Sequence, residues 1–169
     1  RTVALIGDEK LDKLINSHVL VVGLGGIGSF AAEFIARAGV GKMTIVDGDV
    51  VDPSNRNRQL PAMFSTHGVS KADWMAERIR DINPEIELHV VKEFLSPEKA
   101  YEIVGLYNYD YIIDAIDSIT PKINLLKAAY ELKKKIVMSG GAGGKMDPTK
   151  LIVDDLANTY NCVFVKMVR

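Results

Sequence analysis

Short apolar runs alternate along this chain with longer segments in which apolar residues recur every three or four positions. Runs of the length of buried strands occupy residues 19–22, 43–46, 86–91, 111–115 and 136–138. Segments with helical spacing occupy 8–16, 29–38, 70–82 and 121–132, a short helix is expected from residue 96, and 151–153 is expected to be an edge strand. Strands that alternate with helices in this way predict an α/β fold, a doubly wound, mostly parallel sheet with helices on both faces.

The first apolar run leads directly into a glycine-rich turn. Val22 is followed by Gly23-Leu24-Gly25-Gly26-Ile27-Gly28, and a helical pattern begins at Ser29. In such a turn the first glycine permits the tight bend, the second lets the backbone approach a phosphate, and the third lets the helix pack against the strand. The helix N-terminus adds free N–H groups and a positive dipole. A Rossmann-like nucleotide site is therefore predicted here.

Acidic residues follow two further strands. Asp47 ends the second strand about 20 residues after the turn, where an acid commonly binds a ribose. Asp114 and Asp117 close the run at 111–115. Because ligands of such sheets bind outside the carboxyl ends of the strands, we expect these acids to face the glycine turn. Asp117 is a candidate Mg²⁺ ligand, since Mg²⁺ is often bound by one or two carboxylates together with phosphate oxygens.

A long polar connection, residues 47–68, follows the second strand. A connection of this length inside a compact domain more often has a function than not. Arg58 lies within it and Lys71 follows shortly after. Together with Asn55 as a donor, they are the fixed cations and dipoles that stabilise a triphosphate under attack. Taken singly, each cation is explained equally well as a solvated surface residue.

Composition restricts the class of protein but does not indicate which reaction it catalyses. The 169 residues are 47% hydrophobic and 25% charged, with a net charge of −1, which suits one globular domain and gives no global sign of nucleic-acid binding. No apolar run approaches the ~18 residues that span a bilayer, and no signal-peptide pattern is seen. The single cysteine, Cys162, forms no intramolecular disulfide or four-cysteine zinc site and is expected to be a packing residue. This cysteine usage is compatible with a cytoplasmic location.

Six ordered motifs resemble those of the ubiquitin-activating/ThiF/MoeB/HesA superfamily across nearly the whole chain. They are Gly23-x-Gly25-Gly26-x-Gly28, Asp47-Gly48-Asp49, Asn55-x-x-Arg58-Gln59, Gly68-x-x-Lys71, Ile82-Asn83-Pro84 and Asp114-x-x-Asp117. The resemblance implies a single ATP-binding ThiF-type domain over residues 1–169, with an N-terminal helical segment at 1–17 and without the family's C-terminal part. It also implies adenylation of a carboxylate by ATP and Mg²⁺, with release of pyrophosphate.

The same resemblance implies roles for individual residues. The implied nucleotide-binding set, with the glycines along the phosphates and Asp47 at the ribose, is Gly23, Gly25, Gly26, Gly28, Asp47, Asp49, Asn55, Arg58, Gln59 and Lys71. Arg58, Lys71 and Asp117 are the expected catalytic residues, and Asp117 is also the expected metal ligand. Arg1 matches, by its distance before Gly7, a catalytic arginine that family dimers insert into the partner's active site. A homodimer is therefore expected.

Four stretches resemble one branch of this superfamily, whose members are dehydratases acting on threonylcarbamoyladenosine in tRNA. They are Arg1-Thr2 with Leu5-Ile6-Gly7, residues 57–62, residues 114–118 and the most discriminating stretch, residues 141–149. The resemblance implies that ATP activates the threonyl carboxylate of the modified tRNA and that the neighbouring carbamoyl group then closes a ring on it. A sulfur-relay protein is a further partner that this branch suggests.

Two other enzymatic functions are consistent with part of the pattern. A ThiF/MoeB-like adenylyltransferase of a sulfur-carrier protein would use the same nucleotide site. That branch often carries Cys-x-x-Cys zinc pairs, whereas Thr159 and Val165 stand at the required offsets from Cys162. A NAD-binding oxidoreductase would explain the glycine turn and Asp47, but it would leave Arg58 and the other polar residues unused. A non-catalytic scaffold with the same fold is a third alternative.

Overall fold

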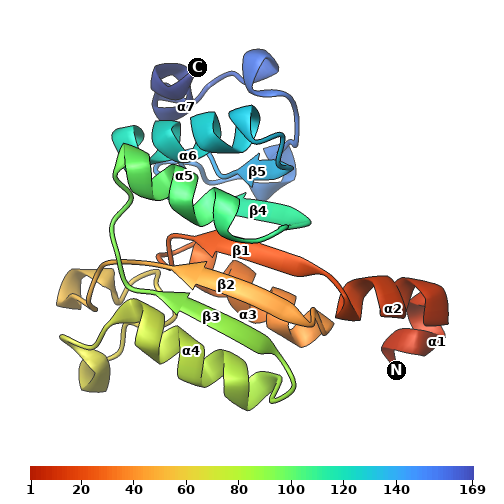
Figure 1. Ribbon diagram of the computed structural model, residues 1–169. Coiled ribbons are helices and arrows are strands. Elements are labelled where there is room, and N and C mark those ends of the chain that lie inside the picture. The colour runs from red at the N-terminus through yellow and green to blue at the C-terminus, as the bar shows by residue number, and fades with distance from the viewer.

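A computed structural model describes all 169 residues, which form one five-stranded sheet flanked by helices (Figure 1). The strands are β1 (His18–Val22), β2 (Lys42–Val46), β3 (Glu87–Val91), β4 (Tyr111–Asp114) and β5 (Ile136–Met138). Their order in the sheet is β3-β2-β1-β4-β5, and every neighbouring pair is parallel. The predicted doubly wound, mostly parallel sheet is confirmed, and the parallel pairing extends through the whole sheet.

The central strand β1 is buried along its whole length, as expected for a parallel strand covered on both faces. Its last residue, Val22, lies level with Val46 of β2 and with Asp114 of β4. The pairing continues one residue further, because Gly23 N–H donates to the Val46 carbonyl and Ala115 N–H donates to the Val22 carbonyl. The segments that follow these three strands therefore start side by side at one edge of the sheet.

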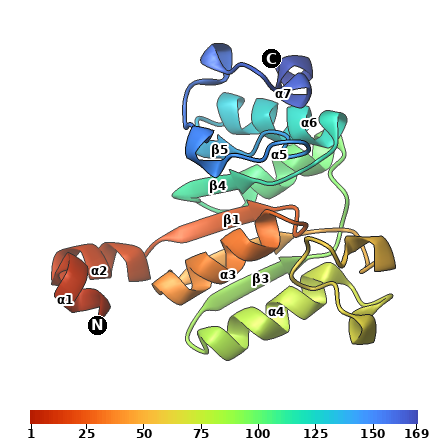
Figure 2. The ribbon, with the colours of Figure 1, turned by 180° about the vertical axis from the view of Figure 1, so that it is seen from behind.

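Helices cover both faces of the sheet. They are α3 (Gly28–Ala38) and α4 (Lys71–Ile82) on one face, and α5 (Pro97–Leu106) and α6 (Ile119–Glu131) on the other. Figure 2 shows α3 and α4 on the face that is seen from behind. Neighbouring side chains of β1 point to opposite faces of the sheet, because side chains alternate along a strand. Val21 packs with α3 and α4, whereas Leu20 packs with α5 and α6.

The helix boundaries follow recognisable capping residues. The Ser70 hydroxyl accepts a hydrogen bond from Asp73 N–H at the start of α4, as is typical of an N-cap serine. Helix α6 begins at Ile119, two residues before the predicted start at Pro121. Proline is tolerated there because the N–H groups of the first turn have no partner within the helix.

The predicted N-terminal helical segment consists of two short helices, α1 (Thr2–Ile6) and α2 (Asp8–Ile15). They meet at Gly7, whose φ of 79° lies in the left-handed region that favours glycine. Neither helix contains a buried residue. In Figure 1 both helices lie beyond the end at which β1 begins, opposite the edge at which β1 leads into the glycine turn.

The prediction of an edge strand at 151–153 is wrong, because these residues are not part of the sheet. They lie between two short 3-10 turns, η3 (Pro148–Lys150) and η4 (Leu156–Asn158), and helix α7 (Val163–Val168) follows. The side chains of Asp147 and Asp155 accept backbone N–H groups at the two turns, so the chain bends before and after this apolar run. No helix of the structure has both the length and the apolar composition needed to cross a membrane.

Candidate nucleotide site

A cavity of about 580 Å³ lies at the carboxyl ends of the strands, within the size range of ligand sites in enzymes. The predicted site residues that line it are Gly23, Gly25, Gly26, Asp47, Asp49, Arg58, Gln59, Lys71 and Asp117. Gly28, Asn55 and Arg1 are not among the lining residues. The sheet therefore brings together residues that are as much as 94 positions apart in the sequence, Gly23 and Asp117.

The glycine turn has the shape that its sequence predicts. Gly23 has a φ of 87°, and a Cβ atom at this position would lie 2.9 Å from the carbonyl oxygen of Ala115. A Cβ atom on Gly28 would lie 1.7 Å from the carbonyl oxygen of Gly23, so only glycine fits where α3 passes behind the turn. Gly25 and Gly26 face the cavity with bare backbone, which a phosphate group can approach closely.

Asp47 anchors the end of β2 against the glycine turn. Its two carboxylate oxygens accept hydrogen bonds from Leu24 N–H at 2.6 Å and from Asp49 N–H at 2.7 Å. Burial raises the pKa of Asp47, and these hydrogen bonds act against that rise. Each carboxylate oxygen keeps a further lone pair, so Asp47 can also accept a hydroxyl group of a bound ribose.

Lys71 is the first residue of α4, and its ammonium group reaches the cavity from that helix start. Its Nζ lies 3.0 Å from Oδ2 of Asp49, and its backbone N–H donates to the Asp49 carbonyl. The Lys71 side chain is 6% exposed, whereas that of Asp49 is 54% exposed. Asp49 thus fixes a largely desolvated cation at the cavity wall.

The connection after β2 carries Arg58 and Gln59 and contains two short turns, η1 (Pro53–Asn55) and η2 (Phe64–Thr66). Arg58 packs directly on the glycine turn, since a Cβ atom on Gly26 would lie 3.2 Å from its Cγ. The Arg58 guanidinium donates to Oδ1 of Asn57 at 2.9 Å. Gln59 is buried, and its Oε1 has no hydrogen-bond partner. A buried acceptor without a donor is costly, so a donor on a bound ligand would be stabilising there.

Asn55 and Arg1 lie outside the cavity. The side chain of Asn55 accepts a hydrogen bond from Asp52 N–H at 3.2 Å and closes a reciprocal cap around η1. Asn55 therefore orders the connection that carries Arg58. Arg1 precedes α1 at the opposite end of the sheet (Figure 1), so it does not contribute to the cavity of its own chain.

Asp114 and Asp117, both expected at the nucleotide site, have different surroundings. Asp117 lines the cavity, and its carboxylate makes no hydrogen bond or ion pair within the chain. Asp114 has no exposed surface and lies 2.8 Å from Nζ of Lys122, which is equally buried. Lys122 also donates to the Ser139 carbonyl at 3.1 Å. Only Asp117 is therefore placed to contact a ligand.

Sequence reasoning missed Lys122, which is buried against Asp114. It also missed the aromatic residues Phe94 and Phe164, which line the cavity. The burial of Lys122 could have been inferred from its spacing in the sequence. It stands three and seven residues before Leu125 and Ala129, with which it shares the buried face of α6. The two phenylalanines belong to irregular or terminal segments and left no comparable signal.

Cys162 is partly buried and belongs to neither core cluster, so its expected role as a packing residue stays a prediction. Its sulfur accepts a hydrogen bond from Gly141 N–H at 3.3 Å, and Gly141 belongs to the loop that follows β5 and lines the cavity. The thiol therefore holds this loop against the start of α7.

The residues of the cavity fit a nucleoside triphosphate with Mg²⁺. Bare glycine backbone faces the cavity beside two cations, Arg58 and Lys71, and the amide oxygen of Gln59 lacks a donor. No group of three or more His, Cys, Asp or Glu side chains is arranged to hold a metal ion by itself. The single carboxylate of Asp117 is nevertheless sufficient for Mg²⁺ when phosphate oxygens supply further ligands.

This chain belongs to the ThiF family, which matches residues 1–169. It is 45% identical over 158 residues to the tRNA threonylcarbamoyladenosine dehydratase of Escherichia coli (strain K12), a match that covers 94% of this chain and 59% of that protein. The Bacillus subtilis (strain 168) protein of the same name is 46% identical over 169 residues, or 100% of this chain and 66% of that protein. This chain thus spans about 59–66% of the length of these two relatives.

A solved structure has the same fold. The crystal structure of the E. coli tRNA N6-threonylcarbamoyladenosine dehydratase, TcdA, in complex with ATP matches with a TM-score of 0.96 and 43% sequence identity. The match covers 99% of this chain and 69% of that one. The resemblance to the ThiF superfamily that the motifs indicated is therefore confirmed across the chain.

Proposed function

We propose that this chain is the ATP-binding part of a tRNA threonylcarbamoyladenosine dehydratase. One observation carries the proposal: a single cavity combines the glycine turn with Arg58, Lys71 and Asp117. A dinucleotide site needs the turn and a ribose-binding acid, whereas two cations and a further acid suit a triphosphate that undergoes attack. Relatives of that name, and the ATP complex of one of them, support this choice.

The reaction explains why a triphosphate is needed. A free carboxylate is a poor electrophile because oxide or hydroxide is a poor leaving group. In the proposed first step a carboxylate oxygen of the threonyl group attacks the α-phosphorus of ATP, and the bond to pyrophosphate breaks. In the second step the neighbouring carbamoyl group attacks the acyl carbon, AMP leaves with the bonding electrons, and one carbamoyl proton is lost. The net change in the tRNA is the loss of water.

The residues of the cavity have different roles in the proposed reaction. The bare backbone of Gly25 and Gly26 lies along the phosphates, and Asp47 accepts a ribose hydroxyl group. Arg58 and Lys71 supply positive charge where negative charge develops during the attack. Asp117 would hold Mg²⁺, which when bound neutralises part of the phosphate charge.

Full-length protein with ATP, Mg²⁺ and threonylcarbamoyladenosine-containing tRNA tests this function directly. We expect pyrophosphate release and ring closure, detected by mass spectrometry of the nucleosides, with modified tRNA but not with unmodified tRNA. Asp117→Ala should abolish both signals while circular dichroism stays unchanged. Pyrophosphate release with a sulfur-carrier protein alone would favour the adenylyltransferase, and binding of NAD but not ATP would favour the oxidoreductase.

We also propose that the enzyme is a homodimer in which Arg1 enters the partner's cavity. The N-terminus, where Arg1 stands, lies at the opposite end of the sheet from the cavity (Figure 1), which supports this arrangement. The exposed side chains of Ile27, just before α3, and of Phe30 and Phe34 within it also support it. Mixing inactive Arg1→Ala and Asp117→Ala proteins should restore partial activity, because a mixed dimer contains one intact site. No restoration after verified subunit exchange would exclude the arrangement. A sulfur-relay partner stays a prediction from the resemblance, and a cytoplasmic location stays a prediction from the cysteine usage.

A further inference from the structure

We propose that Ser29 is a positioning residue of the ATP site, because its buried hydroxyl ties the glycine turn to the connection that carries Arg58. The inference rests on the proposed function and adds a residue that touches neither the nucleotide nor the reacting groups. Ser29 is the second residue of α3 and has no exposed surface. It is also absent from the cavity lining.

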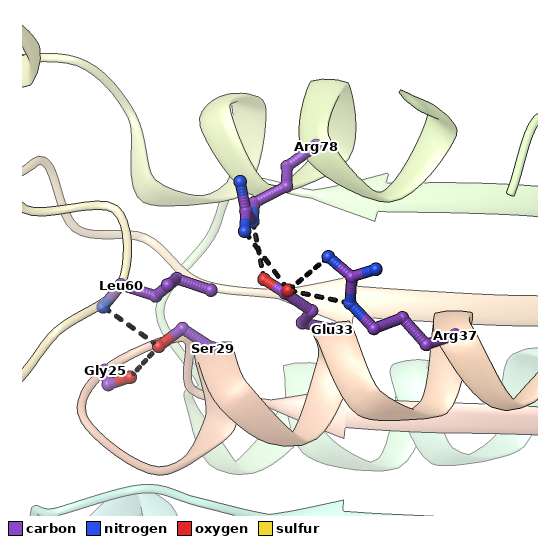
Figure 3. Close-up of polar contacts among 6 residues, drawn as sticks. All are labelled: Gly25, Ser29, Glu33, Arg37, Leu60 and Arg78. Carbon is purple, nitrogen blue, oxygen red and sulfur yellow. Dashed lines mark hydrogen bonds and ion pairs between the residues drawn. The ribbon is translucent and has the colours of Figure 1, made fainter. Parts of the chain in front are cut away.

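The Ser29 hydroxyl contacts two segments that are far apart in the sequence. It donates a hydrogen bond to the Gly25 carbonyl at 2.6 Å and accepts one from Leu60 N–H at 3.4 Å. Figure 3 shows Ser29 between these two backbone groups, with Gly25 in the turn and Leu60 in the connection. Both hydrogen-bonding directions of the hydroxyl are therefore used.

The hydrogen bond to the Gly25 carbonyl would not by itself support a positioning role for Ser29. Serine hydroxyls in helices often bond to the carbonyl four residues earlier, and Gly25 stands in that position. The second bond is different, because Leu60 N–H has no other partner in the structure. The side chain of Leu60 packs against the core under α3 and α4. The residue directly after Arg58 and Gln59 is thus held both by its side chain and by its backbone.

This arrangement affects the position of Arg58. Arg58 packs on Gly26, where a Cβ atom would lie 3.2 Å from its Cγ, and its outer contacts are with Ser54 and Asn57 of its own connection. The link from the connection to the turn through Ser29 therefore sets where the guanidinium lies relative to the glycine backbone. Loss of the hydroxyl would leave the partly buried Leu60 N–H without a partner, a cost that is relieved when the connection moves away from the turn.

Glu33, one helical turn further along α3, provides a contrast. It accepts hydrogen bonds from Arg37 at 2.8 Å and from Arg78 of α4 at 3.1 Å (Figure 3). This group joins the two helices and contacts neither the turn nor the connection. Changes at Glu33 should therefore reduce stability without changing the affinity for ATP.

The test compares ATP binding by Ser29→Ala and two control variants of the full-length protein. Isothermal titration with ATP and Mg²⁺, well below the unfolding temperature, should show a dissociation constant raised roughly three- to tenfold, as expected for one lost hydrogen bond. Ser17→Ala removes a similar bond, from Ser17 Oγ to the Lys13 carbonyl at 2.6 Å, far from the cavity. Ser17→Ala and Glu33→Gln should bind ATP like the wild type.

A double-mutant cycle separates positioning from a general effect. If Ser29 acts by placing Arg58, then Ser29→Ala should weaken ATP binding little further in an Arg58→Ala background. Unchanged binding by Ser29→Ala, or losses that simply add, would overturn the inference.

Amide hydrogen exchange at Leu60 in the ligand-free protein gives a readout that is independent of ATP. We expect faster exchange at Leu60 in Ser29→Ala than in the wild type, because the amide loses its acceptor. Wild-type protein that binds no ATP would contradict the proposed function, and unchanged exchange at Leu60 would overturn the inference about Ser29 by itself.

Discussion

The ammonium group of Lys122 lies 2.8 Å from the carboxylate of Asp114, and neither side chain is exposed to solvent. Asp114 ends β4, and Lys122 also donates to the carbonyl of Ser139, the residue directly after β5. The pair therefore joins two strand ends directly behind the wall that carries Asp117. A buried ion pair of this kind contributes little compared with apolar packing, but the loss of one partner leaves a buried charge without compensation.

Lys122→Met should consequently destabilise the fold strongly. Methionine has similar length but no charge, so the carboxylate of Asp114 would lose its cation in a buried position. We expect the free energy of unfolding to fall by about 3–5 kcal/mol, measured by urea denaturation at pH 7. The double variant Lys122→Met/Asp114→Asn removes both charges and should recover part of this loss. A single variant as stable as the wild type would contradict the pairing.

Arg58→Ala should weaken ATP binding without affecting stability. Arg58 is exposed at the cavity rim, so its loss should change the unfolding free energy by less than about 0.5 kcal/mol. A hydrogen bond from a charged donor contributes roughly 1.5–3 kcal/mol, which corresponds to an ATP dissociation constant about 10- to 150-fold higher. Arg56→Ala is the matched control, because Arg56 is an exposed arginine of the same connection outside the cavity. Equal effects of the two substitutions on calorimetric titration would exclude a specific role for Arg58.

Gly28→Ala should prevent normal folding. The added methyl group would lie 1.7 Å from the carbonyl oxygen of Gly23 and 3.0 Å from the Cβ of Ala115, and the rigid Gly23 backbone leaves little room to move. We expect a loss of at least about 3 kcal/mol, seen as a lowered thermal midpoint or as insoluble protein. Gly105→Ala is the control, since Gly105 lies within α5 and the nearest atom to an added Cβ is 3.8 Å away. That variant should be more stable by about 0.5–1 kcal/mol.

Glu33 should make stability depend on pH in the acid range. Hydrogen bonds from Arg78 and Arg37 hold the pKa of Glu33 below its ordinary value, although burial acts in the opposite direction. The unfolded chain therefore binds a proton at higher pH than the folded chain does, and this part of the stability is lost as the pH falls through the folded pKa. Urea denaturation of the wild type and Glu33→Gln should show the largest difference at pH 7. The difference should shrink below about pH 4.3, the ordinary pKa of glutamate, and a difference that grows in acid would contradict this assignment.

The elements of the fold were largely predictable because their signals are local. The buried run before Gly23 and the helical spacing around Lys71 each identify an element without knowledge of its neighbours. The prediction of an edge strand at 151–153 is wrong for a related reason. Three apolar residues in a row are consistent with a strand, but only pairing with β5 would make them one, and the turns capped by Asp147 and Asp155 direct the chain elsewhere.

The sequence predicted which residues belong to the candidate site better than it predicted how those residues are arranged in space. Asp47, Arg58, Lys71 and Asp117 were identified from motifs, and all four line one cavity. The different surroundings of Asp114 and Asp117 were not predictable, because the two acids stand at the same strand end and differ only in which way they face.

The amino-acid sequence by itself determined the alternation of strands and helices, the glycine turn and the polar residues that follow the strands. Hydrophobic spacing and backbone freedom act over a few residues, so they can be read directly from the chain. The tertiary structure alone decided that Lys122 neutralises Asp114, that Asn55 caps a turn outside the cavity, and that Ser29 joins Gly25 to Leu60. These contacts depend on distances between segments that meet only after the sheet has formed, and no local pattern specifies such distances.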